Sequence, residues 1–270
     1  MTERFLELLY PSSLYCLCCG KYTDGSRSYS LCDHCISRMD FAMREFVLPV
    51  GGEAAGRQRD EAGRAAAAAG QTDEDGRAAA AGGGIGLSAM GYGLYERQLI
   101  FALKYSGKTY VARHIAAILF DCLKKRLAES GNCPWLRADV IVPVPLHAER
   151  QRLRGFNQAE RIAFHLSRQT GIPLADGVLL RVRNTRPQRA LSAEERKYNM
   201  EGAFALSEQR AAAIRGKRVL LIDDIFTTGA TAAACAEALR KGGAARVDFL
   251  ALAAAGRSGK NCADQVPTLE

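Results

Sequence analysis

The sequence predicts an α/β fold, in which a parallel sheet is flanked by helices and preceded by a small metal-binding module. Two apolar runs rich in branched residues, at 139–144 and 219–223, each lead into a polar turn and then into a helical pattern. This alternation is typical of a parallel sheet whose crossovers are helices. Five of the nine Cys lie within the first 35 residues. Such crowding, with an odd Cys count, favours a metal site in a reducing compartment over a disulfide framework.

Composition narrows the classes of partner. The chain of 270 residues is long enough for one medium domain and a small appendage, and its net charge of +8 favours acidic partners such as phosphates, nucleotides or nucleic acid. The basic excess is concentrated in 147–197, which has eleven Arg and Lys against five Asp and Glu. No apolar run approaches about 18 residues, and residues 1–11 lack the basic start of a secretory signal. We therefore expect a cytoplasmic protein without membrane insertion.

Two C-x-x-C pairs near the amino terminus are separated by twelve residues. Their members are Cys16, Cys19, Cys32 and Cys35. Two such pairs can wrap four thiolates around one tetrahedral Zn²⁺, and Gly20 permits the tight turn after the second Cys. A segment this short cannot bury a core, so the metal would supply the folding energy. Cys18 and His34 are competing ligands of minor weight, and buried or redox-active cysteines are the alternative interpretation.

Composition also divides the chain. Residues 51–84 contain 12 Ala and 9 Gly among 34 positions and have no large aliphatic or aromatic side chain. Such a segment buries too little apolar surface to offset its ordering entropy, so we expect a disordered linker. The predicted organisation is a zinc-ribbon-like module over 1–50, this linker over 51–84, the main α/β domain over 85–256, and a flexible tail over 257–270.

Hydrophobic periodicity places the elements of the main domain. The expected strands cover 85–95, 139–144, 173–182, 204–206, 219–223 and 247–253. The expected helices cover 96–105, 111–127, 159–170 and 232–240. A long charged segment, 183–201, has little periodicity, and we expect it to form a lid over a reactive site. Lys104 is interpreted as the solvated end of its helix, in preference to an anion contact.

The run from 219 to 231 has the layout of a phosphate site. A buried strand ends at two adjacent carboxylates, Asp223 and Asp224, and is followed by a turn of hydroxyl residues and glycine. The residues of this turn are Thr227, Thr228, Gly229 and Thr231. Backbone N–H groups at a helix N-terminus attract a phosphate, whereas the carboxylates repel it and suit ribose hydroxyls or Mg²⁺ instead. The alternative is a strand end with a simple Asp or Thr helix cap.

A second strand, at 139–144, ends in a polar turn that is rich in arginine. Arg150, Arg152 and Arg154 alternate with other residues before Gly155 and the next helix. Ligands bind at the carboxyl ends of strands in open α/β sheets, and the planar guanidinium group suits phosphate oxygens. We therefore expect these three arginines to bind phosphate groups.

The run from 219 to 231 resembles the 5-phosphoribosyl-1-pyrophosphate (PRPP) motif of type I phosphoribosyltransferases. The resemblance implies a parallel sheet of that type, with Asp223 and Asp224 as catalytic residues that hold the ribose hydroxyls. It also implies that the turn at 227–231 grips the 5′-phosphate, and that Mg²⁺ accompanies PRPP. The three arginines would bind the pyrophosphate, and Arg196, on the expected lid, would act as a further catalytic residue by closing over the site.

Three blocks extend the resemblance to most of the chain. They are 143–158 with its Arg-rich run and Gly-Phe-Asn-Gln, 188–191 with Arg196 and Asn199, and the PRPP motif. Together with the two Cys pairs, these blocks are similar to the ComF late-competence family. Members of that family are associated with the uptake of single-stranded DNA during natural transformation. The resemblance implies a phosphoribosyltransferase-like protein without implying a particular reaction.

Two functions remain open from the sequence. As a transferase, the protein would move ribose 5-phosphate from PRPP to a nitrogen acceptor, mainly through positioning and charge. As a DNA-handling protein, it would bind single-stranded DNA through its Arg-rich run, with Phe156 or Phe226 stacking on a base. The zinc module would dock a DNA-uptake helicase or a membrane channel, or serve only as a stabiliser. A homodimer is left open.

Overall fold

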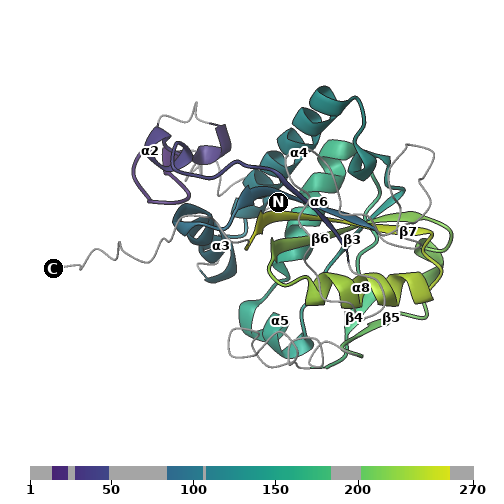
Figure 1. Cartoon of the computed structure of the whole chain (residues 1–270). Helices are drawn as coiled ribbons and strands as arrows, with labels where there is room; N and C mark the ends of the chain where they lie inside the picture. Colours follow the sequence, from purple (N-terminus) through teal and green to yellow (C-terminus); the bar gives the residue numbers. More distant parts are fainter. Residues whose placement is uncertain (1–13, 24–27, 49–83, 106–107, 184–201, 256–270) are drawn as a thin grey trace.

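A computed structural model, shown in Figure 1, describes residues 14–23, 28–48, 84–105, 108–183 and 202–255. Five strands form one sheet in the order β1-β2-β7-β6-β3. Their bounds are Arg44–Val47 for β1, Ile85–Gly91 for β2, Val140–Pro143 for β3, Arg218–Phe226 for β6 and Arg246–Ala254 for β7. β1 is antiparallel to β2, whereas the other three pairs are parallel. The prediction of an α/β fold with a mostly parallel sheet is therefore confirmed.

Helices cover both faces of this sheet. They are α3 (Leu94–Tyr105), α4 (Val111–Ser130), α6 (Gln158–Thr170) and α8 (Ala230–Lys241). Figure 1 shows α4 and α6 on one side of the sheet and α8 on the other. In β6, Leu220 and Ile222 belong to the apolar core shared with α3, α4 and α6, which we call the first core. Val219 and Leu221 belong to the second core, which lies under α8. Successive side chains of a strand point to opposite faces, so an apolar strand requires cover on both.

The expected strand at 173–182 is only partly present. Leu174 makes an isolated parallel bridge to β3, and the chain then turns at Gly177, whose φ of +63° is left-handed. After the turn, β4 (Leu179–Arg181) pairs with β5 (Phe204–Leu206) in a separate antiparallel sheet of two strands. One continuous strand would require extended backbone throughout, and the glycine turn prevents it.

The arginine-rich run forms a helix, α5 (Ala148–Arg154), so the prediction of a turn was wrong. His147 caps the helix, because its Nδ1 atom accepts a hydrogen bond from the backbone N–H of the second helical residue at 3.4 Å. Gly155 ends the helix with a φ of +83°. None of the residues of α5 is buried, so its sequence carries no helical stripe of apolar residues. The helical spacing places Arg150 and Arg154 on one face and Arg152 on another.

The amino-terminal module packs against the main domain. It contains a 3₁₀ turn, η2 (Ser28–Ser30), and a short helix, α2 (Asp33–Ile36). Leu17 belongs to the same apolar core as α3 and α4, and the Tyr29 hydroxyl donates a hydrogen bond to Asp121 Oδ2 of α4 at 2.6 Å. The chain then continues into β1, which joins the edge of the main sheet beside β2. The module is therefore held to the main domain by apolar contacts, a hydrogen bond and strand pairing.

Some of the predicted segments lie outside the described residues. They are nearly all of the linker at 51–84, nearly all of the lid at 183–201 with Arg196, and the tail at 257–270. The domain boundaries accordingly stay predictions. Among the helices that the structure describes, none combines the length and the apolar content needed to cross a membrane.

Candidate functional site

Two adjacent carboxylates lie near the carboxyl end of β6. Asp224 is only 4% exposed, and Asp223 is half-buried. Strand pairing continues past them to Phe226, so the strand is longer than the predicted 219–223. Asp223 Oδ1 accepts a hydrogen bond from the backbone N–H of Asp224 at 2.8 Å, and the two carboxyl groups also interact with one another. The sheet thus holds a coupled acidic pair at the edge where ligands bind in α/β folds.

Lys104, in the last turn of α3, forms an ion pair with Asp224. The Lys104 side chain is 19% exposed and the Asp224 side chain 5%, so water screens this pair little. The interpretation of Lys104 as a solvated helix end was wrong. The buried residues of α3 belong to the same apolar core as Leu220 and Ile222 of β6, and this packing places Lys104 beside the end of β6. The lysine therefore belongs to the acidic site.

The two carboxyl groups titrate differently because their surroundings differ. Burial and the neighbouring Asp224 charge raise the pKa of Asp223 well above its usual value. Burial also opposes ionisation of Asp224, but the Lys104 ammonium group lowers the pKa of that carboxyl overall. Two carboxylates in contact do not ionise together easily. The pair therefore keeps Asp224 ionised and favours a proton on Asp223.

Gln158, the first residue of α6, connects the acidic pair to the arginine-rich helix. Its side chain is 6% exposed and hydrogen-bonds to Asp224, while its Oε1 atom accepts from Arg154 Nη1 at 2.6 Å. Asn157 holds α6 in place, because its Oδ1 atom accepts from the backbone N–H of Ala159 at 3.1 Å and its Nδ2 atom donates to Val144 O at 3.0 Å. The Asn-Gln pair thus caps the helix and orients the site.

The three arginines of α5 have different surroundings. Arg154 is half-buried, bonded to Gln158, and stacked over the Tyr105 ring at 5.3 Å. Arg150 is half-buried and lies close enough to Arg181, at the end of β4, to affect its ionisation. Arg152 is exposed on another face of the helix. A common phosphate site for all three arginines stays a prediction.

Arg181 is a site residue that the sequence analysis missed. Burial and the nearby Arg150 charge lower the pKa of its guanidinium group, and the Asp223 charge opposes this effect. Its guanidinium group also stacks over the Phe204 ring at 5.4 Å. Lys104 and Gln158 were missed as well. Only the Gly-Phe-Asn-Gln block, a polar sequence at the start of an amphipathic helix, signalled one of these three residues in advance.

The turn after β6 has the features of an anion site. Gly229 has a φ of +78° and precedes α8, which begins without a side-chain cap. Thr228 Oγ1 is buried and has no hydrogen-bond partner among the described residues. Thr227 is exposed, and Thr231 lies in the first turn of the helix. A phosphate at this helix N-terminus would find backbone N–H donors and a threonine hydroxyl.

Of the two rings expected to stack on bases, Phe156 is buried and Phe226 is partly buried. Phe156 is 8% exposed and belongs to the first core. Phe226 is stacked on Phe46 with ring centroids 3.7 Å apart, and it also contacts Phe249. The expectation that Phe156 stacks on a base was therefore wrong, because its ring is buried, whereas base stacking by the partly buried Phe226 stays a prediction.

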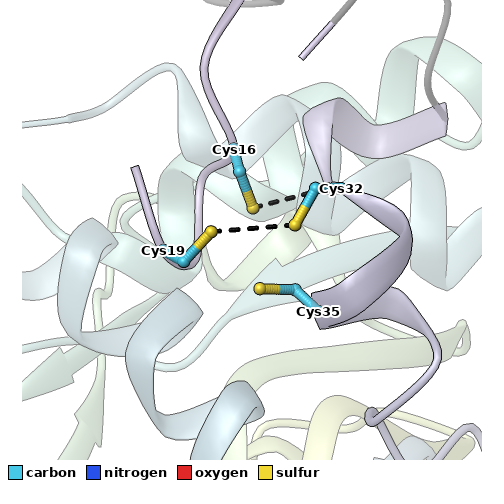
Figure 2. A group of neighbouring side chains, drawn as sticks. All are labelled: Cys16, Cys19, Cys32 and Cys35. Atoms are coloured by element: carbon cyan, nitrogen blue, oxygen red, sulfur yellow. Dashed lines mark hydrogen bonds between the residues drawn. The ribbon is translucent and has the colours of Figure 1, made fainter. Parts of the chain in front are cut away.

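Four cysteine sulfur atoms converge in the amino-terminal module, as Figure 2 shows. Cys16 and Cys19 come from a loop, and Cys32 and Cys35 from the start of α2. All four Sγ atoms lie within 4.8 Å of one another, and those of Cys19 and Cys32 are 3.7 Å apart. A tetrahedral site with metal–sulfur bonds of about 2.3 Å places its sulfur atoms about 3.8 Å apart. The cluster could therefore hold one structural metal ion.

Backbone groups favour the thiolate form of one member of this cluster, Cys16, whereas burial raises the pKa of Cys19 and Cys35. The Cys32 N–H donates a hydrogen bond to Cys16 Sγ at 3.4 Å. Burial raises the pKa of Cys16, but backbone N–H groups, including that of Cys19, outweigh it and lower the pKa to about 7. Cys18 lies outside the cluster, since its thiol donates to Gln98 Oε1 at 2.8 Å and burial raises its pKa to about 12. His34 is also outside the cluster, and its Nδ1 atom lies 2.7 Å from Nη1 of Arg38.

Comparisons with known proteins agree with this geometry. A family model described as "Phosphoribosyl transferase domain" matches residues 157–266, which include β6, the acidic pair and α8. The chain is 36% identical over 158 residues to Competence protein F of Haemophilus influenzae, covering 58% of this chain and 67% of that protein. It is 34% identical over 155 residues to DNA utilization protein YhgH of Escherichia coli, covering 57% and 65%. It is 38% identical over 116 residues to Competence protein ComFC of Bacillus subtilis, covering 42% and 43%.

These matches span about two thirds of the Haemophilus and Escherichia proteins and less than half of the Bacillus protein. The segment shared with the phosphoribosyl transferase model contains the parallel strands β6 and β7 and the helix between them. The chain therefore belongs to the competence protein F (ComF) family and carries a phosphoribosyl transferase domain.

Proposed function

We propose that this protein binds PRPP with Mg²⁺ at the carboxyl end of β6 and handles single-stranded DNA during DNA uptake. The observation that supports PRPP most directly is the pairing of two carboxylates with an anion-binding turn. Asp223 and Asp224 are followed by the uncapped start of α8 and by the buried, unbonded hydroxyl of Thr228. The relatives, which are named for competence and DNA utilization, support the DNA role.

The residues present fit the parts of PRPP. Thr227, Thr228, Gly229 and Thr231 would surround the 5′-phosphate, with backbone N–H groups and hydroxyls donating. Asp223 is half-buried and would accept from a ribose hydroxyl, whereas the buried Asp224 is held by Lys104 and Gln158 and would act mainly through its charge. Mg²⁺, when bound with PRPP, would neutralise the pyrophosphate oxygens.

The pyrophosphate group would bind the guanidinium groups beside the acidic pair. Burial and repulsion by the neighbouring Arg150 charge lower the pKa of Arg181. An anion between the two arginines would relieve this repulsion, and arginine forks match phosphate oxygens well. Arg154 would extend the same surface, while Arg152, which is exposed, would contact a DNA phosphate.

The amino-terminal cysteine cluster would hold Zn²⁺ in a structural role. Four cysteine ligands around one ion are typical of closed structural zinc sites, which have no open position for a substrate. The module packs on α4 through Tyr29 and Leu17, so the metal would stabilise a fixed surface beside α3. That surface could dock a DNA-uptake helicase or channel on the cytoplasmic side.

The match to a phosphoribosyl transferase domain favours a second candidate function. In that reaction the bond between C1 of PRPP and the pyrophosphate oxygen breaks, and the electron pair leaves with pyrophosphate. A nitrogen acceptor forms the new bond to C1 and loses a proton. Asp223 and Asp224 would hold the ribose, and Arg196 would close over it from a segment outside the described residues.

Calorimetry with PRPP and Mg²⁺ tests the site. The double variant Asp223→Asn/Asp224→Asn should lose most of the affinity, and Thr228→Ala should cost about 1–2 kcal/mol, roughly 5- to 30-fold in Kd. Asp176→Asn is a matched control, because Asp176 is an exposed carboxylate paired with Arg210. Equal affinity of the wild type and the double variant would refute this site. Release of pyrophosphate from labelled PRPP with a panel of nitrogen acceptors would establish the transferase alternative.

A further inference from the structure

Helix α3 has apolar side chains on its solvent face as well as on its buried face. Leu99 and Leu103 are fully buried in the first core. On the opposite side, Phe101 is 59% exposed and Tyr105 is 65% exposed. One apolar face is sufficient to hold a helix against a sheet, so the second is unexplained by folding.

The two exposed rings form a pair. Their centroids are 4.7 Å apart with an interplanar angle of 38°, and the Arg154 guanidinium group lies over the Tyr105 ring at 5.3 Å. Arg154 is also the residue that Gln158 connects to the acidic pair. The aromatic pair therefore lies directly beside the proposed PRPP site, and one guanidinium group is shared between them.

A groove of about 360 Å³ is lined by one of these rings, Phe101, and by residues of the cysteine module. It lies between the loop that carries Cys18 and the exposed face of α3. Arg97 and Lys108 line it together with Phe101, and none of its lining residues is acidic. The groove thus combines an aromatic ring with two positively charged side chains.

We propose that Phe101 and Tyr105 form a base-stacking platform for single-stranded nucleic acid, whose phosphates run along the groove past Arg97 and Lys108. Unpaired bases stack on exposed aromatic rings whatever their sequence, and a cationic groove beside the rings follows the backbone. An apolar peptide could bind this face whether or not acidic side chains lined the groove. A phosphate backbone, in contrast, requires a groove without them. The proposal rests on the DNA-handling part of the proposed function and moves its stacking residues from Phe156 and Phe226 to α3.

Fluorescence anisotropy with labelled oligo(dT) of about 16 nucleotides, the upper end of the usual site size, tests the platform. Phe101→Ala/Tyr105→Ala should weaken binding on the order of 5- to 150-fold for each ring lost, because a stacked base contributes about 1–3 kcal/mol. The slope of log affinity against log salt should stay unchanged. Arg97→Gln/Lys108→Gln should instead lower that slope by about 1.4, since each phosphate contact on a single strand contributes about 0.7.

Two further variants serve as controls. Phe164→Ala removes another exposed ring, which stacks with Arg168 on α6 at 5.9 Å, and should bind oligo(dT) like the wild type. Phe101→Tyr/Tyr105→Phe keeps both rings and should also bind like the wild type. Because the substituted side chains are exposed, melting temperatures should stay close to the wild-type value.

Three results would overturn the platform. If Phe101→Ala/Tyr105→Ala binds oligo(dT) as tightly as Phe164→Ala, the rings do not stack on bases. If the wild type elutes as a dimer and the double variant as a monomer, a second copy of the chain covers this face. If the wild type binds no oligo(dT) even at low salt, the DNA-handling role fails as well, while calorimetry with PRPP remains an independent test of the acidic site.

Discussion

Replacing Lys104 by methionine removes the ammonium group that pairs with Asp224 and keeps a side chain of similar length. In the wild type, the Lys104 side chain is 19% exposed and the Asp224 side chain 5%. After the substitution Asp224 keeps its contacts with Asp223 and Gln158 but loses the cation that lowers its pKa. A buried carboxylate without a cation is unstable, so we expect Asp224 to take up a proton or the fold to loosen around it.

The burial of the pair sets the expected magnitude. Removing one partner of a buried ion pair lowers the free energy of unfolding by about 3–5 kcal/mol. Because Lys104 is partly exposed, we expect a loss of about 3 kcal/mol. For a folded unit of this size, about 3 kcal/mol lowers the melting temperature by roughly 6–12 °C. The double variant Lys104→Met/Asp224→Asn removes both charges and should recover much of this loss, because replacing a whole buried pair is close to neutral.

Urea denaturation followed by tryptophan fluorescence measures these changes. Trp135 is fully buried and its Nε1–H donates to Phe249 O on β7 at 3.1 Å, so its emission reports on the sheet. Lys124→Met is the matched control, since Lys124 pairs with Asp121 at 2.6 Å but both side chains are about half exposed. The free energy of unfolding of this control variant should fall by less than about 1 kcal/mol. Equal losses for Lys104→Met and Lys124→Met would refute the argument that burial makes the first pair strong.

The metal and the acidic pair yield two further predictions. Purified protein should contain one metal ion per chain by elemental analysis; Cys19→Ser should lose it and Cys18→Ser should keep it, because Cys18 lies outside the cluster. A metal-free protein with an intact module would contradict this. The raised pKa of Asp223 means that the folded state binds its proton more tightly than the unfolded state, so this stabilisation is complete below the unfolded pKa and is lost as pH rises through the folded pKa. Asp223→Asn should therefore become progressively more stable than the wild type in melting experiments from about pH 4 upward. A difference in melting temperature that does not vary with pH would contradict this.

Local patterns carried the information for the main motif and the cysteine cluster. The apolar run of β6, the adjacent Asp223 and Asp224, and Gly229 before α8 are neighbours in the chain, so strand, turn and helix signals occur in one short stretch. The two C-x-x-C pairs are similarly local, because each pair forms one turn that presents two sulfur atoms. Such features are visible in the sequence because their geometry depends on few distant contacts.

Local sequence patterns did not predict the helix α5 or which aromatic rings are exposed. The alternating arginines of α5 have no buried face, so nothing in their spacing indicated a helix or separated Arg152 from Arg150 and Arg154. Likewise Phe156 was expected at a ligand surface from its chain position alone, and core packing buries its ring instead. Exposure of a ring depends on which elements cover it, and that is a property of the whole fold.

The sequence by itself determined the α/β class, the acidic pair with the hydroxyl-rich turn that follows it, and the four clustered cysteines. Only the tertiary structure decided that Lys104 neutralises Asp224, that Arg181 lies beside Arg150, and that the Phe101 and Tyr105 rings are exposed beside Arg154. The physical reason is that these residues lie far apart in the chain on elements that each form for local reasons. Their distances, and hence the charges and ring faces they present to one another, are set when α3, α5 and β4 pack around the end of β6.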